Sequence, residues 1–219
     1  KEDWWITNEI GKRLGLDWNY NHPKDIFDEM SQAMPSLQNI TWERLQKESS
    51  VTYPCSSLEA KGEEIVFGDK FPTTDGKGKF VYANATSPDE MPDSKFPMIL
   101  TTGRQLEHWH TGAMTRKASN LDAIEPEASV SLSPNDILSN KIQPGELIRV
   151  STKRGTIDIR VRQDRSIPDG VIFIPFCYKE AAANLLTNPA LDPIGKIPEF
   201  KYCAAKMKKL DKSSSISYK

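Results

Sequence analysis

The spacing of apolar residues divides the chain into a helical beginning and a β-rich remainder. Over residues 3–16, tryptophan, isoleucine and leucine recur at helical spacing, which predicts an amphipathic helix. Pro23 predicts the first turn of a second helix, and Thr41 is a candidate N-cap for a third. Because three short helices bury little surface alone, we expect residues 1–48 to pack against a neighbouring domain.

Residues 49–95 have a different texture, rich in proline, glycine, serine and aspartate. The sequence PTTDGKGKF places an Asp-Gly turn between Phe71 and Phe80. This composition predicts a surface connector that contains one hairpin.

From Phe96 onward, short apolar runs are separated by turn residues, which is typical of β-structure. FPMILTT, LIRVS and TIDIRVRQ are predicted strands, and a turn at Arg154-Gly155 joins the last two. SPND, from Ser133, has the capping residue and proline of a helix start. VIFIPF lacks alternation, as a strand buried on both faces does. Strands at this spacing predict a small closed barrel.

The composition argues against several classes of protein. The 219 residues contain 29 Lys+Arg and 30 Asp+Glu, and this balance argues against a dedicated nucleic-acid binder. No apolar run approaches the roughly 20 residues that a membrane-spanning helix needs. Cys55, Cys177 and Cys203 lie far apart, which excludes a disulfide framework and a CxxC-type metal site. We expect a soluble protein of a reducing, cytoplasmic compartment.

The chain begins at Lys1, without an initiator methionine or a signal segment. It therefore reads as a piece of something longer, with a processed N-terminus as the alternative.

The densest cluster of polar donors lies in TTGRQLEHWHTGAMTRKAS, residues 101–119. A strand that ends in Gly103 and Arg104 lets backbone N–H groups approach an anion, and the guanidinium can grip phosphate oxygens. Hydroxyls and imidazoles add neutral donors, and Trp109 offers a flat face to a ring system. Together they suit a phosphorylated, ring-containing cofactor. The alternative explanation is a solvated loop with a structural tryptophan.

A metal site is a weaker hypothesis. His108 and His110 are two residues apart and would face one side of an extended segment, but no third ligand follows at conventional spacing. His22 is interpreted as a loop histidine. We therefore expect no metal site made by this chain alone.

Four stretches, FPMILTTGRQLEHWHTGAMTR, PGELIRVSTKRGTIDIRV, GVIFIPF and AAANLLTNPALDPIGKIPEFKYCAAKM, carry a family resemblance. In this order they resemble the C-terminal region of the large (alpha) subunits of molybdopterin-dependent formate dehydrogenases, of the molybdopterin oxidoreductase family. The resemblance covers residues 1–210. It implies a mixed α/β, mainly β fold: a six-stranded double-psi β-barrel over 96–210 that binds the cofactor dinucleotides, preceded by a helical segment of a neighbouring domain over 1–48, with 211–219 as a tail.

The resemblance also implies a set of cofactor contacts, of which Arg104, His108, Trp109 and His110 are the ones we favour. Phe176 matches a position near the substrate funnel, although its place at the end of a strand suits core packing equally well. In the family, a lysine that contacts the cofactor stands directly before a cysteine. Here Tyr202 stands directly before Cys203, and the lysine, Lys201, comes one residue earlier. The full set is Thr102, Gly103, Arg104, Glu107, His108, Trp109, His110, Thr111, Thr115, Arg116, Phe176, Asn184, Lys201 and Tyr202.

The family's metal-binding cysteine or selenocysteine, its catalytic histidine and arginine, and its 4Fe–4S segment have no counterpart in these residues. The resemblance thus implies that the complete protein binds bis-molybdopterin guanine dinucleotide with molybdenum or tungsten. It also implies that this chain contains no catalytic and no metal-binding residue, and that the chain alone is inactive. Implied partners are the remainder of the catalytic subunit, electron-transfer subunits and the substrate formate.

Three alternatives stay open. A nitrate reductase carries a similar TGR…HWHT block, although NLLTNPALDP favours formate dehydrogenase. A non-catalytic molybdopterin-binding or assembly protein would also lack the metal ligand. A free-standing double-psi barrel would need no partner.

Overall fold

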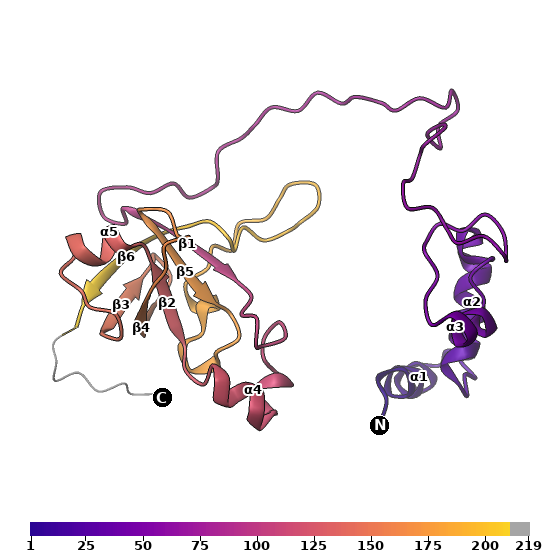
Figure 1. The fold of residues 1–219 in the computed structure, drawn as a ribbon, viewed down its shortest axis with the longest axis horizontal. Helices are drawn as coiled ribbons and strands as arrows, with labels where there is room; N and C mark the ends of the chain where they lie inside the picture. The colour runs from indigo at the N-terminus through magenta and orange to yellow at the C-terminus, as the bar shows by residue number, and fades with distance from the viewer. Residues whose placement is uncertain (211–219) are drawn as a thin grey trace. The chain divides into compact units, whose positions relative to one another are not determined.

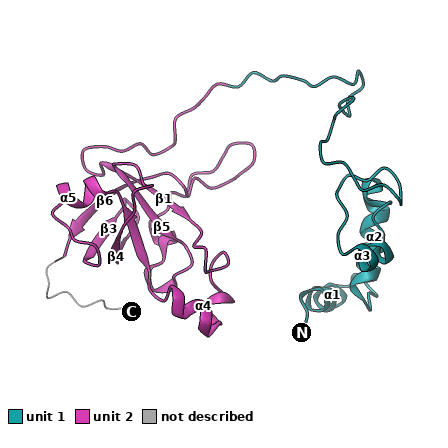
Figure 2. Ribbon diagram, viewed as in Figure 1, with its two compact units in different colours: residues 1–83 teal, residues 84–219 magenta. Residues whose placement is uncertain are grey.

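The computed structural model describes residues 1–210 (Figure 1). The chain divides into two compact units, residues 1–83 and residues 84–219 (Figure 2).

The first unit is helical, as the sequence predicts. It contains α1 (Asp3–Arg13), α2 (Pro23–Ala33), the 3₁₀ turn η1 (Pro35–Leu37) and α3 (Trp42–Glu48). The Thr41 hydroxyl accepts the Arg44 N–H at 3.1 Å and caps α3 as expected. His22 lies outside the helix, in the bend before α2, and it caps α2, because its ring nitrogen accepts the Lys24 N–H at 3.1 Å.

Helix α1 buries little of its apolar face within this unit. Ile6, Ile10 and Leu14 are exposed. Gly11 makes the close contact of this helix with the segment that follows it. The Trp18 ring lies so close to Gly11 that a Cβ there would meet it at 2.2 Å.

The segment between α3 and the first strand forms neither helix nor strand. The turn expected after Phe71 is present, closed by the Phe71 N–H bonded to the Gly76 carbonyl at 2.9 Å. The strands of the expected hairpin are absent. Phe80, Val81 and Tyr82 are largely exposed, so no apolar surface is buried to hold two strands together.

The second unit is a closed six-stranded barrel, and the predicted fold class is confirmed. Its strands are β1 (Met98–Gly103), β2 (Ser129–Leu132), β3 (Leu147–Ser151), β4 (Thr156–Gln163), β5 (Val171–Pro175) and β6 (Cys203–Lys209). Around the barrel they follow the order β1-β5-β2-β4-β3-β6. The pairs β1–β5 and β2–β4 are parallel and the others antiparallel, so the chain crosses between non-consecutive strands.

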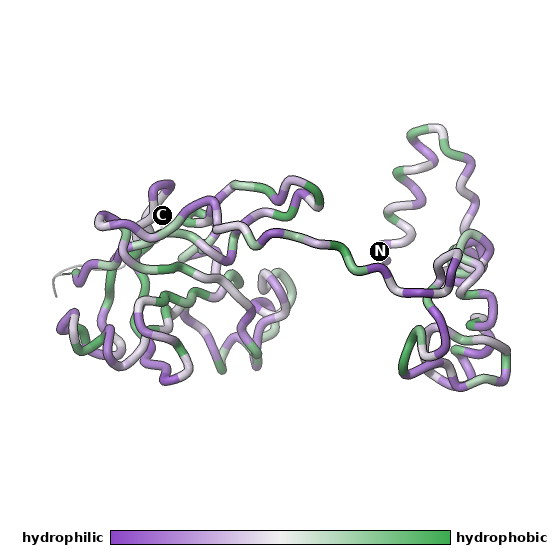
Figure 3. The backbone as a smooth tube through the Cα atoms, turned by 90° about the horizontal axis from the view of Figure 1, so that it is seen from above, coloured by the Kyte–Doolittle hydropathy of each residue, from purple (hydrophilic) through white to green (hydrophobic). Residues whose placement is uncertain are grey.

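Aliphatic side chains from several strands fill the interior of the barrel. Leu100, Val130, Ile148 and Ile172 are fully buried, and each contributes roughly 1.5–3 kcal/mol to folding. Apolar segments run through the middle of the barrel, and hydrophilic segments predominate at its turns (Figure 3). Strand β5 alternates after all: Ile172 and Ile174 are buried, whereas Val171 and Phe173 are only partly covered, so one face of this strand meets the surface.

Several short elements connect the strands. They are η2 (Thr115–Lys117), α4 (Ser119–Ile124), α5 (Pro134–Ser139), η3 (Lys179–Ala181) and η4 (Ala183–Leu185). The Ser133 hydroxyl caps α5 by accepting the Asp136 N–H at 3.0 Å, as predicted.

Candidate functional site

The carboxyl end of β1 gathers three parts of the chain. The Thr102 hydroxyl, on a buried residue, donates to the Phe200 carbonyl at 3.1 Å. The Gly103 carbonyl accepts the Phe176 N–H at 3.1 Å. A Cβ on Gly103 would meet the Phe173 ring at 2.5 Å, so a larger residue at this position would displace the ring. The loops after residues 103, 175 and 199 therefore share one rigid base.

Arg104 follows this base directly and is exposed. Within residues 1–210 its side chain makes no hydrogen bond or ion pair, so the guanidinium is available to a ligand. The adjacent turn is ordered, with the His108 N–H bonded to the Gln105 carbonyl at 3.2 Å. A hydrogen bond from the Gln105 side chain lowers the pKa of Glu107. Glu107, three residues after Arg104, is therefore ionised at neutral pH.

His108 is buried, 2% exposed, and both of its ring nitrogens have partners within the chain. Nε2 lies 2.8 Å from the Glu125 carbonyl, and Nδ1 lies 3.4 Å from the Thr115 hydroxyl. A carbonyl can only accept, so Nε2 carries the proton and Nδ1 accepts from Thr115. The Tyr178 hydroxyl donates to the same Glu125 carbonyl at 3.0 Å. His108 is therefore held inside the protein, with both ring nitrogens bonded to neighbouring residues.

The same network fixes the exposed tip of the loop. The Thr115 hydroxyl accepts the Trp109 N–H at 3.0 Å, which ties the tip to His108. Trp109 is 62% exposed, and its ring lies edge-on to His110 with centroids 4.5 Å apart. Thr111 is also exposed. The loop therefore presents an aromatic face, an imidazole and a hydroxyl on a buried, hydrogen-bonded support.

Arg116 is committed to the protein itself. Its guanidinium binds Asp122 at 2.6 Å and Glu180 at 2.8 Å, and it lies 4.7 Å from the centroid of the Tyr178 ring. With two carboxylates bound, it has little positive charge left for a phosphate.

A cavity of about 410 Å³ lies beside Arg116 and is lined by Thr111, Lys117 and Lys179, among others. Lys117 and Lys179 are exposed cations at its wall. Lys179 was missed in the sequence, where its only signal is its position shortly after the VIFIPF strand. Within residues 1–210 these two lysines form no ion pair, whereas Arg116 forms two.

The remaining predicted residues lie on the chain that returns from β5 to β6. Asn184 and Lys201 are exposed, and Tyr202 is half-buried with its hydroxyl 3.9 Å from the Met91 sulfur. Phe176 is half-buried and packs against the barrel core, as its alternative interpretation expected. The Thr102–Phe200 hydrogen bond brings the 200–202 segment to the end of β1.

All three cysteines are buried free thiols. Burial raises the pKa of Cys177 to about 11, and burial also raises the pKa of Cys203. Within residues 1–210, no three histidine, cysteine or acidic side chains cluster as a metal site would require. The same residues contain no helix long and apolar enough to cross a membrane.

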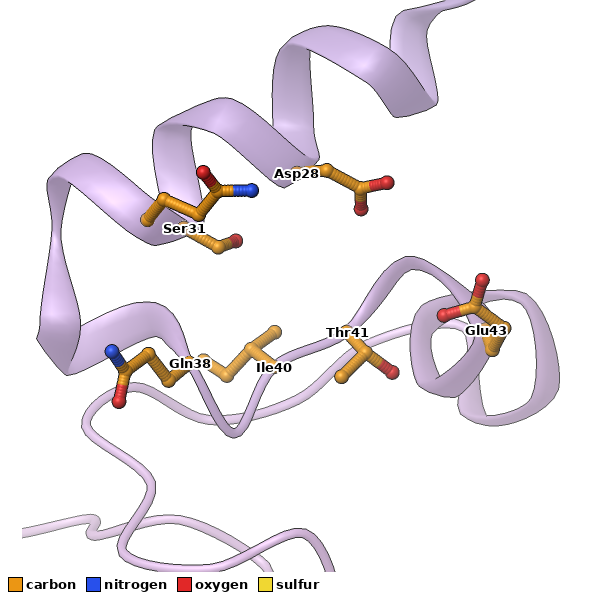
Figure 4. Close-up of a pocket in the computed structure, with 7 residues that line it drawn as sticks. Asp28, Ser31, Gln38, Ile40, Thr41 and Glu43 are labelled. Carbon is orange, nitrogen blue, oxygen red and sulfur yellow. The ribbon is translucent and has the colours of Figure 1, made fainter.

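The first unit also has a hollow, of about 330 Å³, between α2 and the residues that precede α3 (Figure 4). Asp28 and Glu43 lie at its wall, but Lys24 binds both carboxylates, at 2.7 and 3.0 Å. One ammonium group thus balances one of the two carboxylate charges of this hollow and bridges both side chains.

Comparison with known proteins points to one family. Residues 98–204 match the family described as "Molydopterin dinucleotide binding domain". The chain is 40% identical over 95% of its length to the F420-dependent formate dehydrogenase subunit alpha of Methanocaldococcus jannaschii. It is 31% identical over 94% of its length to the assimilatory nitrate reductase catalytic subunit of Bacillus subtilis.

Among solved structures, acetylene hydratase from Pelobacter acetylenicus matches 53% of this chain and 19% of its own, with a TM-score of 0.48 and 23% identity. The chain covers 31% of the formate dehydrogenase subunit and 30% of the nitrate reductase, so it spans about a third of the curated relatives that it matches.

Proposed function

Because residues 98–204 match the family described as "Molydopterin dinucleotide binding domain", we propose that the loop after β1 binds the dinucleotide part of a molybdopterin cofactor. One observation carries this proposal: Arg104, Trp109 and Thr111 are exposed, while the residues that hold them in place are buried. A preorganised, unpaired donor set on a rigid support is what an anionic ligand requires.

The donors present fit this group. Arg104 can bind pyrophosphate oxygens through two parallel N–H groups, and Lys117 and Lys179 add positive charge nearby. The Thr111 hydroxyl and the His110 imidazole donate to neutral oxygens, and Trp109 can stack on a ring. Asn184, Lys201 and Tyr202 would contact the same ligand from the second loop, while His108, Thr115 and Thr102 position the contacting residues.

The complete protein is proposed to be a formate dehydrogenase, which oxidises formate to carbon dioxide. When bound, the cofactor would supply a molybdenum or tungsten centre that accepts two electrons. Residues outside this chain would supply the metal ligand, the catalytic histidine and arginine, and the 4Fe–4S cluster. This chain's own residues bind and orient the cofactor, and electron-transfer subunits would be its further partners. Its three free, buried thiols suit a reducing cytoplasmic compartment.

A nitrate reductase is the second candidate, because a nitrate reductase subunit aligns over nearly the same length. The identity to the formate dehydrogenase subunit is higher, 40% against 31%, and it favours formate as the substrate.

The test is Arg104→Ala in the complete enzyme, with the pterin content of the purified protein as the readout. Loss of a two-point, charge-assisted contact costs about 1.5–3 kcal/mol of binding, so the variant should retain less pterin. Arg104→Lys should recover only part of it, because lysine lacks the planar fork. Arg165→Ala, at another exposed arginine, is the matched control and should retain the wild-type content. Unchanged pterin content in Arg104→Ala would refute the assignment.

A further inference from the structure

A further cavity, of about 390 Å³, lies in the second unit, at the end of β1 that is opposite to the candidate site. Lys95 and Phe96 precede β1, whereas Arg104 follows it, and the strand separates the two ends by roughly 17 Å. Lys206 on β6 pairs in register with Ser151 at the end of β3. Lys153, in the turn between β3 and β4, completes the wall. The cavity thus draws on four segments that the barrel brings together.

Two lysines are gathered here over one aromatic ring. The ammonium groups of Lys95 and Lys206 lie 5.6 and 5.1 Å from the centroid of the Phe96 ring. Phe96 itself is buried, so its ring is a fixed platform. Within residues 1–210, neither ammonium group forms an ion pair. An anion that binds beside the Phe96 ring would be attracted by both charges.

The neighbouring carboxylates do not neutralise this cluster. Glu90 approaches Lys153 only to 3.9 Å, and it already binds Arg154 through both oxygens, at 2.6 and 3.0 Å. Asp93 accepts the backbone N–H groups of Lys95 and Phe96, at 2.8 and 2.7 Å, and its charge interacts with Lys95 and Lys153. The three lysines and Arg154 thus face only two carboxylates among residues 1–210. Among the described residues, none that lines the cavity is acidic. Positive charge is therefore in excess.

The hydroxyl groups of the cavity are also arranged to donate. The Thr152 hydroxyl accepts the Arg154 N–H at 3.2 Å, which leaves its own proton free for a ligand. Thr152 is 7% exposed, so this donor is held in a fixed position. The Ser151 hydroxyl accepts from Thr156 at 3.0 Å and can likewise donate. Three ammonium groups and two hydroxyls thus offer donors to a ligand in this cavity.

We propose that this cavity binds a phosphate-class oxyanion, either inorganic phosphate or the phosphoryl group of a small molecule. Such a group has several acceptor oxygens and a negative charge, which match donors that surround a hollow. The cavity shares no residue with the loop after β1, so this proposal stands independently of the cofactor assignment.

The experiment is an amide NMR titration of the full chain with inorganic phosphate, with chloride at matched ionic strength as the reference. Saturable shifts are expected at Phe96, Thr152 and Lys206, and chloride should not reproduce them. Adenosine monophosphate is titrated in parallel. Equal or tighter binding of inorganic phosphate indicates the free ion, and tighter binding of the ester indicates a phosphoryl group.

The double variant Lys95→Gln with Lys206→Gln should weaken phosphate binding at least tenfold, which corresponds to about 1.4 kcal/mol. Lys208→Gln, on the same strand but outside the cavity, is the matched control and should bind as the wild type does. Arg104→Ala should leave these shifts unchanged, which separates this site from the cofactor loop. Absence of saturation, shifts confined to the loop after β1, or full binding by the double variant would overturn the proposal.

Discussion

The Glu90 carboxylate binds the Arg154 guanidinium through both oxygens, at 2.6 Å to Nη1 and 3.0 Å to Nη2. Only 7% of the Glu90 side chain and 24% of the Arg154 side chain are exposed. Glu90 also accepts the Ala204 N–H at 2.8 Å, and Arg154 donates to the Leu186 carbonyl at 3.1 Å. This pair therefore joins the segment before β1, the β3–β4 turn, β6 and the loop that carries Asn184.

Replacing Glu90 with glutamine should destabilise the barrel by about 2–3 kcal/mol, because the Arg154 charge would be left without its partner in a partly buried place. Urea denaturation of the full chain measures the change. Glu127→Gln is the matched control, since Glu127 pairs with Arg160 at an exposed position. Equal stability of the two variants would show that the Glu90 pair contributes nothing.

The same pair predicts a dependence of stability on pH. The hydrogen bond from Arg154 lowers the pKa of Glu90 below its ordinary value of 4.5. The folded carboxyl holds its proton less tightly than the unfolded one, so its contribution is fully present above pH 4.5 and is lost as the pH falls through the folded pKa. The unfolding free energy of the wild type should therefore fall more steeply below this pH than that of Glu90→Gln. Parallel pH profiles would contradict this.

Thr115→Val should loosen the tip of the candidate site. The Trp109 N–H would lose its acceptor and His108 its donor, at a cost of about 1 kcal/mol. Amide hydrogen exchange at Trp109 should become faster. Thr111→Val, which removes an exposed hydroxyl of the same loop, should leave this exchange rate as it is. If the Trp109 amide exchanges at the same rate in both variants, the hydrogen bond to the Thr115 hydroxyl does not hold the tip.

Gly112→Ala should destabilise the barrel more than Gly145→Ala does. Both glycines have positive φ, +72° and +85°, so alanine is strained at either position by roughly 1–2 kcal/mol. A Cβ at Gly112 would also meet the Cys177 carbonyl oxygen at 2.8 Å, whereas nothing lies within 4 Å at Gly145. Thermal unfolding of the two variants isolates this steric contribution, which is absent if their midpoints coincide.

The chain produced alone should neither reduce a viologen dye with formate nor assemble a 4Fe–4S cluster. A cluster needs about four thiolates, and the three cysteines here are separate and buried. Dye reduction assays and the visible absorption spectrum of the reconstituted chain are the measurements. Activity would contradict both this prediction and the proposed division of roles between this chain and the rest of the subunit.

The barrel strands that contain several aliphatic residues in alternation or in a run could be predicted from the sequence, and those that consist largely of small residues could not. LIRVS and TIDIRVRQ alternate clearly, and Arg154-Gly155 marks their turn. Strand β2 is only Ser129–Leu132, and its serines carry no strand signal. It is fixed by its neighbours, since β2 pairs with β4 and β5. Helix α4 was likewise not predicted.

The candidate site shows the same limit. Its proposed location in residues 101–119 follows from the density of donors in the sequence. Which of those donors are free depends on distant residues: Arg116 is neutralised by Glu180, and His108 is held by the Glu125 carbonyl and by Thr115. These pairings arise only when the barrel closes, so a sequence pattern gives the inventory of donors but not their availability.

The three buried thiols give the chain built-in reporters of its own unfolding. Cys55 lies in the first unit, and Cys177 and Cys203 lie in the second. A thiol reagent reaches them only when the surrounding structure opens, and the raised pKa of Cys177, about 11, slows its reaction further. Peptide-level labelling across a denaturant series would therefore yield separate stability curves for the helical unit and the barrel from one unmodified sample.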